Sequence, residues 1–152
     1  MANNIPEAVV PLGRPVELSF PLPKAPDTRV YLRLTIQMTS ILLFLTTAMN
    51  GDTSTATPLG SFVYALPDRV NPAHTISTPL FTYESSIEFT TRLARLLARK
   101  TAKPVYVGNS ISFASAGLGG TVEEEMEGFK KVVEVIMDEV RKSEGQELVN
   151  GS

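Results

Sequence analysis

Residues 30–45 read VYLRLTIQMTSILLFL, and this stretch decides the fold class. Apolar side chains occupy every second position from Val30 to Met38, which is the mark of a β-strand whose successive side chains point to opposite faces. After Thr39-Ser40, the segment Ile41 to Leu45 is a continuous apolar run, as expected of a strand covered on both faces. The two strands are too close in sequence for a helical crossover, so the stretch predicts an antiparallel hairpin.

Further strands are predicted on both sides of this hairpin. Apolar residues alternate again in three segments: Val16–Leu22, Phe62–Leu66 and Val105–Phe113. A weaker strand covers residues 76–83, and its Pro79 favours an edge position because proline has no N–H to donate to a ladder. The segment Pro23–Asp27 has the composition of a turn.

The apolar period changes to that of a helix in two later segments. Ser85-x-x-Glu88 and Thr121-x-x-Glu124 both match the capping box, in which a hydroxyl and a carboxylate bind free N–H groups at a helix start. The first predicted helix spans about residues 86–102 and the second about 121–142. The apolar faces consist of Phe89, Leu93, Leu96 and Leu97 in the first helix, and of Val122, Met126, Phe129, Val133, Ile136 and Val140 in the second.

These elements predict an α+β fold, with a largely antiparallel β-sheet or sandwich of about six strands and two principal helices. We expect one domain over residues 16–142, preceded by a loosely ordered arm over 1–15 and followed by a fraying tail over 143–152. A chain of 152 residues, of which 43% are hydrophobic, suits a single globular domain.

The composition excludes several kinds of site. The chain has no cysteine, which removes disulfides, thiolate nucleophiles and the usual structural zinc sites, and we expect no cofactor and no metal. The net charge of −2 provides no overall attraction to nucleic acid or to an anionic membrane. The first residues lack a basic segment and a long apolar core, so we expect a cytoplasmic or nuclear location.

Two candidates for chemistry are weak. His74 is the only histidine, and no G-x-S-x-G motif accompanies it, so the sequence favours an exposed loop residue over a catalytic base. The turn Gly117–Gly120 precedes a helix as a phosphate-binding loop would, but it contains no lysine and is followed by Glu123–Glu125, which would repel an anion. The sequence therefore predicts no catalytic residue.

Surface patterning favours protein binding instead. Arg92, Arg95, Arg99 and Lys103 are spaced as one basic stripe, which is either a solvated face or a contact for an acidic partner. No aromatic residues interleave with these charges, and this disfavours a nucleic-acid site. The candidate partner-binding residues are Arg92, Arg95, Arg99 and Lys103 from the first helix and its end, with Val122, Met126, Phe129 and Val133 from the second helix.

Residues 93–109 read LARLLARKTAKPVYVGN, and this segment resembles the proteasome assembly chaperone 4 family, in a form of fungal type. The resemblance lies in Leu97–Thr101, in Lys103, and in the V-x-V strand Val105–Val107 that ends near Asn109. The later segment Glu124–Phe129 is similar to the EEME-x-F start of a helix in that family.

The resemblance implies a non-catalytic assembly chaperone without a cofactor. It implies a heterodimer with a protein like proteasome assembly chaperone 3, which holds α-type subunits, notably the fifth, while the α-ring of the 20S core particle is built. It implies no nucleic acid and no membrane as partners. Two alternatives stay open at this point, a small hydrolase that uses His74 and a nucleic-acid-binding module that uses the basic helix.

Overall fold

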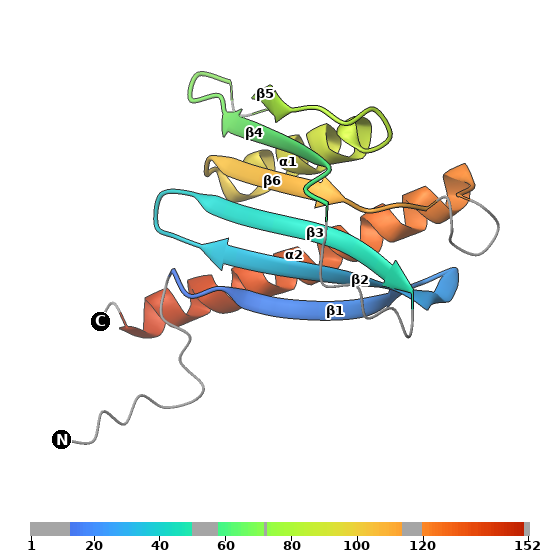
Figure 1. The fold of residues 1–152 in the computed structure, drawn as a ribbon. Helices are drawn as coiled ribbons and strands as arrows, with labels where there is room; N and C mark the ends of the chain where they lie inside the picture. The colour runs from blue at the N-terminus through green and yellow to red at the C-terminus, as the bar shows by residue number, and fades with distance from the viewer. Residues whose placement is uncertain (1–12, 50–57, 72, 114–119, 151–152) are drawn as a thin grey trace.

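The computed structural model describes residues 13–49, 58–71, 73–113 and 120–150 (Figure 1). Six strands and two helices occur in these residues. In chain order they are β1 (Val16–Leu22), β2 (Ala25–Ile36), β3 (Ile41–Met49), β4 (Ser61–Pro67), β5 (Thr75–Phe81), α1 (Ile87–Thr101), β6 (Val105–Ser110) and α2 (Val122–Asn150). Of the predicted N-terminal arm, only its last residues are described, and Gly13 N–H donates a hydrogen bond to the Ile36 carbonyl oxygen (2.9 Å).

All six strands form one sheet in the order β1-β2-β3-β6-β4-β5 (Figure 1). Every neighbouring pair is antiparallel except β3 and β6, which run parallel at the centre of the sheet. The α+β fold and the largely antiparallel sheet are confirmed, and the described strands make a single sheet rather than a sandwich. β5 lies at an edge, as Pro79 predicts.

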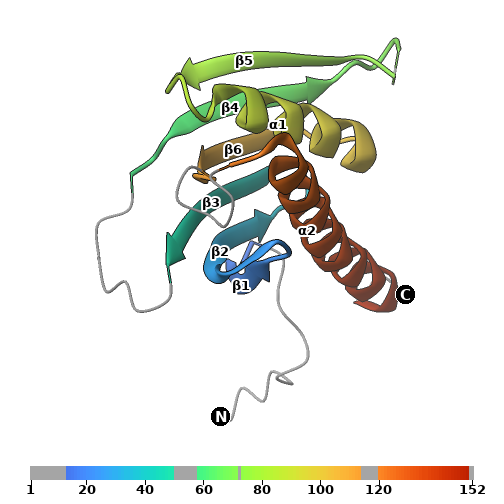
Figure 2. The same cartoon turned by 90° about the vertical axis from the view of Figure 1, so that its right-hand side faces the viewer.

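Both helices cover the same face of this sheet (Figure 2). The covered face supplies the strand half of the core, including Leu34, Ile41 and Leu43, none of which is exposed. Leu93 and Leu97 of α1, together with Val132, Ile136 and Val140 of α2, supply the other half. Burial of such side chains contributes roughly 1.5–3 kcal/mol each, so this layer provides most of the driving force for folding.

The predicted hairpin is confirmed, since β2 and β3 pair antiparallel with Ile36 opposite Ile41. The turn before β2 is shorter than predicted. Leu22 is paired with Ala25, so only Pro23 and Lys24 form the turn and the strand begins inside the predicted turn segment.

The prediction that β3 is covered on both faces is wrong. Ile41, Leu43 and Leu45 are buried, but Leu42 is only half-buried and Phe44 is 37% exposed. The apolar run has no polar member to mark a solvent face, and no described helix covers the second face. This apolar strand face is therefore covered by neither of the described helices.

The two helix starts differ in how they match the capping box. α1 begins one residue later than the box predicts, with Ser86 at the N-cap and no capping hydrogen bond from its side chain. The predicted box at Ser85 is therefore wrong, and the Ser86 hydroxyl instead lies 2.9 Å from that of Ser61 in β4. The α2 box is confirmed with a shift, because Thr121 accepts from the Glu124 N–H (3.3 Å) while Glu124 accepts from the Gly120 N–H (3.0 Å).

Helix α2 continues to Asn150, past the predicted end at residue 142 and through most of the segment expected to fray. The apolar period has ended there, but adding a residue to an existing helix requires only one further hydrogen bond and no new nucleus. The apolar period therefore marks the part of α2 that packs on the sheet, and it does not predict the residue at which the helix ends.

A buried polar link fixes α1 to the centre of the sheet. The Asn109 side chain of β6 is fully buried, and its amide group donates to Thr90 Oγ1 of α1 (3.2 Å) while its oxygen accepts from the Ile111 N–H (3.0 Å). Thr90 donates in turn to the Ser86 carbonyl oxygen (2.6 Å). Among the described side chains, every buried polar atom has a partner.

The backbone of Gly60 lies directly against β6. Its φ is +70°, and a Cβ there would collide with the Asn109 carbonyl oxygen and lie 2.8 Å from the Ser110 Cα. Gly13 has a similar φ of +90°, but a Cβ there would meet no atom within 4 Å. Of these two glycines, only Gly60 therefore combines left-handed backbone with close backbone packing.

We expect Gly60→Ala to destabilise the protein clearly more than Gly13→Ala. The Gly13 variant loses only the freedom that glycine has at positive φ, which corresponds to about 1 kcal/mol. The Gly60 variant must also move β4 away from β6. Urea denaturation of both variants measures the difference, and equal losses would contradict the close approach.

Candidate functional site

The strand face that points away from both helices is here named the open face. The cross-strand register places its side chains in rows, one of which runs from Arg33 through Phe44 and Gly108 to Phe62 and Phe81. A second row joins Leu42, Tyr106 and Tyr64. The apolar members of the open face are Leu42, Phe44, Phe62, Tyr64, Leu66, Ile76, Phe81 and Tyr106.

Aromatic rings form a continuous series across the middle of the open face. The Phe44 and Phe62 rings are stacked at 6.1 Å with an angle of 6°, and Phe62 stacks on Tyr106 at 6.2 Å. Tyr106 in turn contacts Tyr64 at 4.5 Å. Such contacts contribute beyond the area that they bury, by about 0.5–1.5 kcal/mol each, so they hold the rings in a defined surface.

Gly108 makes room for this series. A Cβ at Gly108 would lie 2.7 Å from Phe44 Cδ1 and 3.2 Å from Leu59 Cδ1, so both side chains rest on the bare β6 backbone. This close approach is the physical reason for glycine in the central strand, where it otherwise weakens a sheet.

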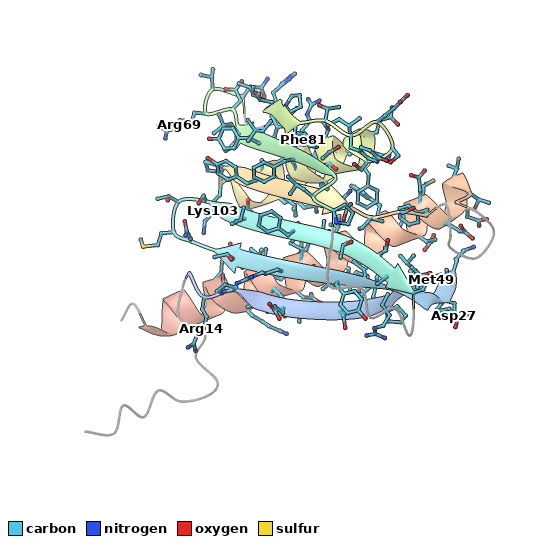
Figure 3. The ribbon with its side chains drawn as sticks, in the orientation of Figure 1. Arg14, Asp27, Met49, Arg69, Phe81 and Lys103 are labelled. Atoms are coloured by element: carbon cyan, nitrogen blue, oxygen red, sulfur yellow. The ribbon has the colours of Figure 1, made fainter. Side chains whose placement is uncertain are left out.

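The open face is apolar from its middle to the β5 edge and more polar toward β1 and β2, although Tyr31 of β2 also lies on it. Phe81 and Ile76 at the β5 edge are 56% and 58% exposed, whereas Glu17, Ser19 and Arg33 stand on the strands at the other side. Figure 3 views this face, with Phe81 at one edge of the sheet and Met49 and Lys103 at opposite ends of the central strands. A hollow of about 390 Å³ opens between Tyr31, Arg33, Phe44 and Leu59.

Tyr64 lies half-buried in the aromatic series. Burial raises the pKa of its phenol above 10.0, and the neighbouring Tyr106 raises the pKa further through charge repulsion and a hydrogen bond. The phenol is therefore neutral at physiological pH, and the centre of the open face carries no charge at Tyr64.

A second surface lies on the helix side of the sheet and is here named the α1 groove. It has a volume of about 840 Å³. Its lining consists of Ala73, Thr75, Ile87, Glu88, Thr91, Arg92, Arg95, Leu96, Arg99 and Phe129. None of these residues belongs to the open face, so the molecule has two separate candidate surfaces.

The predicted basic stripe is only partly brought together. Arg92, Arg95 and Arg99 line the α1 groove, but Lys103 does not. Helix α1 ends at Thr101, Ala102 takes a left-handed conformation with φ 56°, and Lys103 Nζ donates to the Gln37 carbonyl oxygen (3.1 Å) in the β2–β3 hairpin. The chain reversal at Ala102 therefore removes Lys103 from the stripe.

The predicted residues of α2 divide into exposed and packed positions. Val122 and Met126 are 72% and 50% exposed in the first turns of the helix. Phe129 packs edge-on against Phe89 with 5.3 Å between centroids and lines the α1 groove, whereas Val133 packs against the core. The main role of Val133 is therefore to pack α2 against the core.

The weak chemical candidates remain weak. His74 lies in the turn between β4 and β5, where its backbone N–H donates to the Asn71 carbonyl oxygen (2.9 Å) and its carbonyl accepts from the Asp68 N–H (3.1 Å). In the described part of the chain, no group of three or more His, Cys, Asp or Glu residues could hold a metal ion. The glycine-rich turn lies outside the described residues except for Gly120.

None of the described helices is both long and apolar enough to span a bilayer.

Sequence reasoning missed the aromatic centre of the open face. Phe62, Tyr64 and Leu66 were predicted to share one side of a strand, but their side of the sheet was not predicted. A usable signal was present in Ile41–Leu45, because an apolar strand with apolar residues of both parities needs cover on two faces.

Comparison with known proteins now identifies the family. The sequence profile described as proteasome assembly chaperone 4 matches residues 29–111, which is more than half of the 152 residues and runs from β2 through β6. The chain belongs to the proteasome assembly chaperone 4 family. It is accordingly a chaperone of proteasome assembly.

A solved structure has the same fold. It is described as the crystal structure of a novel chaperone complex for yeast 20S proteasome assembly, and it matches with a TM-score of 0.59 and 14% sequence identity. The match covers 87% of this chain and 98% of the yeast chain. No curated protein sequence matches the chain. At this identity the likeness shows the fold alone, while the family assignment rests on the sequence profile.

We expect the absorbance titration of the tyrosines to contain one phenol with a pKa above 10.0 that disappears in Tyr64→Phe. The raised pKa means that the folded state favours the neutral phenol. Its contribution to stability is complete below pH 10.0 and is lost as the pH rises through the folded pKa. A wild-type minus variant difference curve with a midpoint at or below 10.0 would contradict the raised pKa of Tyr64.

Proposed function

We propose that this chaperone works as one half of a heterodimer, with a protein like proteasome assembly chaperone 3 as the other half. The heterodimer holds an α-type subunit, notably the fifth, while the α-ring of the 20S core particle is built. It acts without catalysis and without a cofactor, and its place of work is the cytoplasm or the nucleus. Its contribution is to keep one subunit surface in position until the neighbouring subunits have joined the ring.

One observation carries the heterodimer, namely the aromatic middle of the open face. Phe44, Phe62, Tyr64 and Tyr106 form one aromatic surface, and no described helix lies over it. Soluble monomers rarely expose contiguous apolar patches of this kind, which typically mark a protein interface. A sheet face is best covered by a second sheet face, packed about 10 Å away with interdigitating side chains.

The chemistry of the open face suits a specific partner. An apolar, aromatic centre with polar residues on β1 and β2 is the usual anatomy of a protein interface. A stable interface buries on the order of 1,200–2,000 Å² in total, which a six-stranded sheet is wide enough to provide. The yeast structure of the same fold is itself described as a chaperone complex, and this supports a second chaperone as the partner.

The polar flank offers a basis for choosing the partner. Arg33 stands opposite Phe44 in β3 and Glu17 in β1, and no ion pair among the described residues uses either charge. Charges at the rim of an interface fix its register and disfavour wrong partners. A partner chaperone with matching charges opposite Arg33 and Glu17 would therefore be preferred over one without them.

The function is tested by co-expressing the chain with a protein like proteasome assembly chaperone 3 and with the fifth α-type subunit. We expect the three to co-purify as one complex of fixed stoichiometry, measured by size-exclusion chromatography with light scattering. Recovery of this chain alone, with neither protein bound, would overturn the proposed function.

Phe62→Asp should abolish binding of the partner chaperone, with a dissociation constant at least about 100-fold higher, because the complex would bury an unpaired carboxylate. Val70→Asp provides the matched control, since Val70 is equally apolar but is 94% exposed in the turn after β4. Isothermal titration calorimetry measures both. Unchanged binding by the Phe62 variant, with its fold verified by circular dichroism, would remove the open face from the interface.

A further inference from the structure

The α1 groove remains unexplained when the open face is assigned to the partner chaperone. The groove lies on the helix side of the sheet, whereas the open face lies on the other side. A chaperone that pairs through one face needs a second surface for the subunit that it holds. The α1 groove offers such a surface, with arginine side chains from α1 and an aromatic ring from α2.

Three arginines on one wall of the groove have no acidic partner. Arg92, Arg95 and Arg99 form no ion pair with any described carboxylate, whereas five other basic side chains of the protein do. Glu88 is the only acidic residue among the described residues of the lining. The groove is thus a local positive surface on a chain whose net charge is −2, and it attracts anionic groups such as carboxylates.

Two of these arginines are already held in position. Arg95 Nε donates to Thr75 Oγ1 (3.2 Å), and its NH2 group donates to the Thr75 carbonyl oxygen (3.3 Å). The Arg92 guanidinium lies 5.3 Å from the centre of the Phe129 ring. Ordered side chains lose less conformational entropy when they bind, so they favour a ligand more than mobile surface charges do.

Part of the remaining lining is apolar and offers a place for an uncharged side chain. Ile87, Leu96 and Phe129 contribute apolar surface beside the arginines. Met126 lies one turn before Phe129 on α2 and is 50% exposed, so the apolar surface extends beyond the groove. The groove therefore combines carboxylate-binding donors with an apolar seat.

We propose that the α1 groove binds an acidic peptide segment of the client subunit, with carboxylates on Arg92 and Arg99 and an apolar side chain against Ile87 and Leu96. This inference rests on the proposed function, which supplies the client. A nucleic acid fits less well, because the one ring of the lining is covered by Arg92 and is not free to stack on a base. The groove and the open face then bind client and partner independently.

The test compares two double variants with the same change in charge. Arg92→Glu/Arg99→Glu alters the groove, and Lys100→Glu/Lys103→Glu alters two neighbouring cations that do not line it. Each variant is purified as the heterodimer with its partner chaperone. The first probe is a fluorescent peptide in which Glu and Leu alternate, with a matched peptide of Gln and Leu, and the second probe is the purified α-type subunit.

We expect the groove variant to bind both the acidic peptide and the α-type subunit about 10-fold or more weakly, and with less dependence on salt. The Lys100/Lys103 variant should bind as the wild type does, and the Gln peptide should not bind. Both variants should retain the partner chaperone, because neither touches the open face.

Equal affinity of the two double variants for both probes would overturn the groove proposal and leave the heterodimer intact. A single-stranded RNA that displaces the peptide and itself loses affinity in the groove variant would overturn it in favour of a nucleic-acid site. Loss of a self-associated form in the groove variant would overturn it in favour of a second copy. If the wild-type heterodimer binds the acidic peptide but no α-type subunit, the proposed client is wrong, and with it the client assignment of the groove.

Discussion

The parallel pairing of β3 with β6 is the interaction on which the rest of the structure depends. It joins residues 41–46 to residues 105–110 and turns a three-stranded meander and a second group of strands into one sheet. Parallel neighbours require a crossover, and here that connection contains β4, β5 and α1. Asn109 then links the same strand to α1 through Thr90, so the position of the helix follows from the central pair.

Because the crossover brings α1 to the face that α2 also covers, the other face of the sheet stays open (Figure 2). As a result, an apolar side chain of β3 is exposed to water: Phe44 is 37% exposed, whereas its neighbours Leu43 and Leu45 are buried. Because Gly108 has no side chain, Phe44 can pack against the β6 backbone and stack on Phe62. The open face therefore presents aromatic rings at its centre. An exposed apolar surface of ordered aromatic side chains is typical of a protein interface, where a partner removes it from water.

The candidate surfaces could be predicted from the sequence to different degrees. The spacing of Arg92, Arg95 and Arg99 predicts that they share a helix face, and they do line one groove. Lys103 has the same spacing but lies beyond the left-handed residue Ala102, where the helical geometry no longer applies. The contact between Arg92 and Phe129 joins two helices that are distant in sequence, and no local pattern predicts it.

The sequence by itself determined the existence of the strands, the alternating burial along β2, the edge position of β5 and the capping of α2. These features depend on side chains two to four residues apart, whose relative positions the local backbone sets. Only the tertiary structure decided which strands are neighbours, which face the helices cover, and that Ser86 binds Ser61 instead of capping α1. Those outcomes depend on contacts between segments that are distant in sequence. The fold as a whole must bury the apolar surface and give each buried hydrogen-bonding group a partner, and no local pattern specifies how it does so.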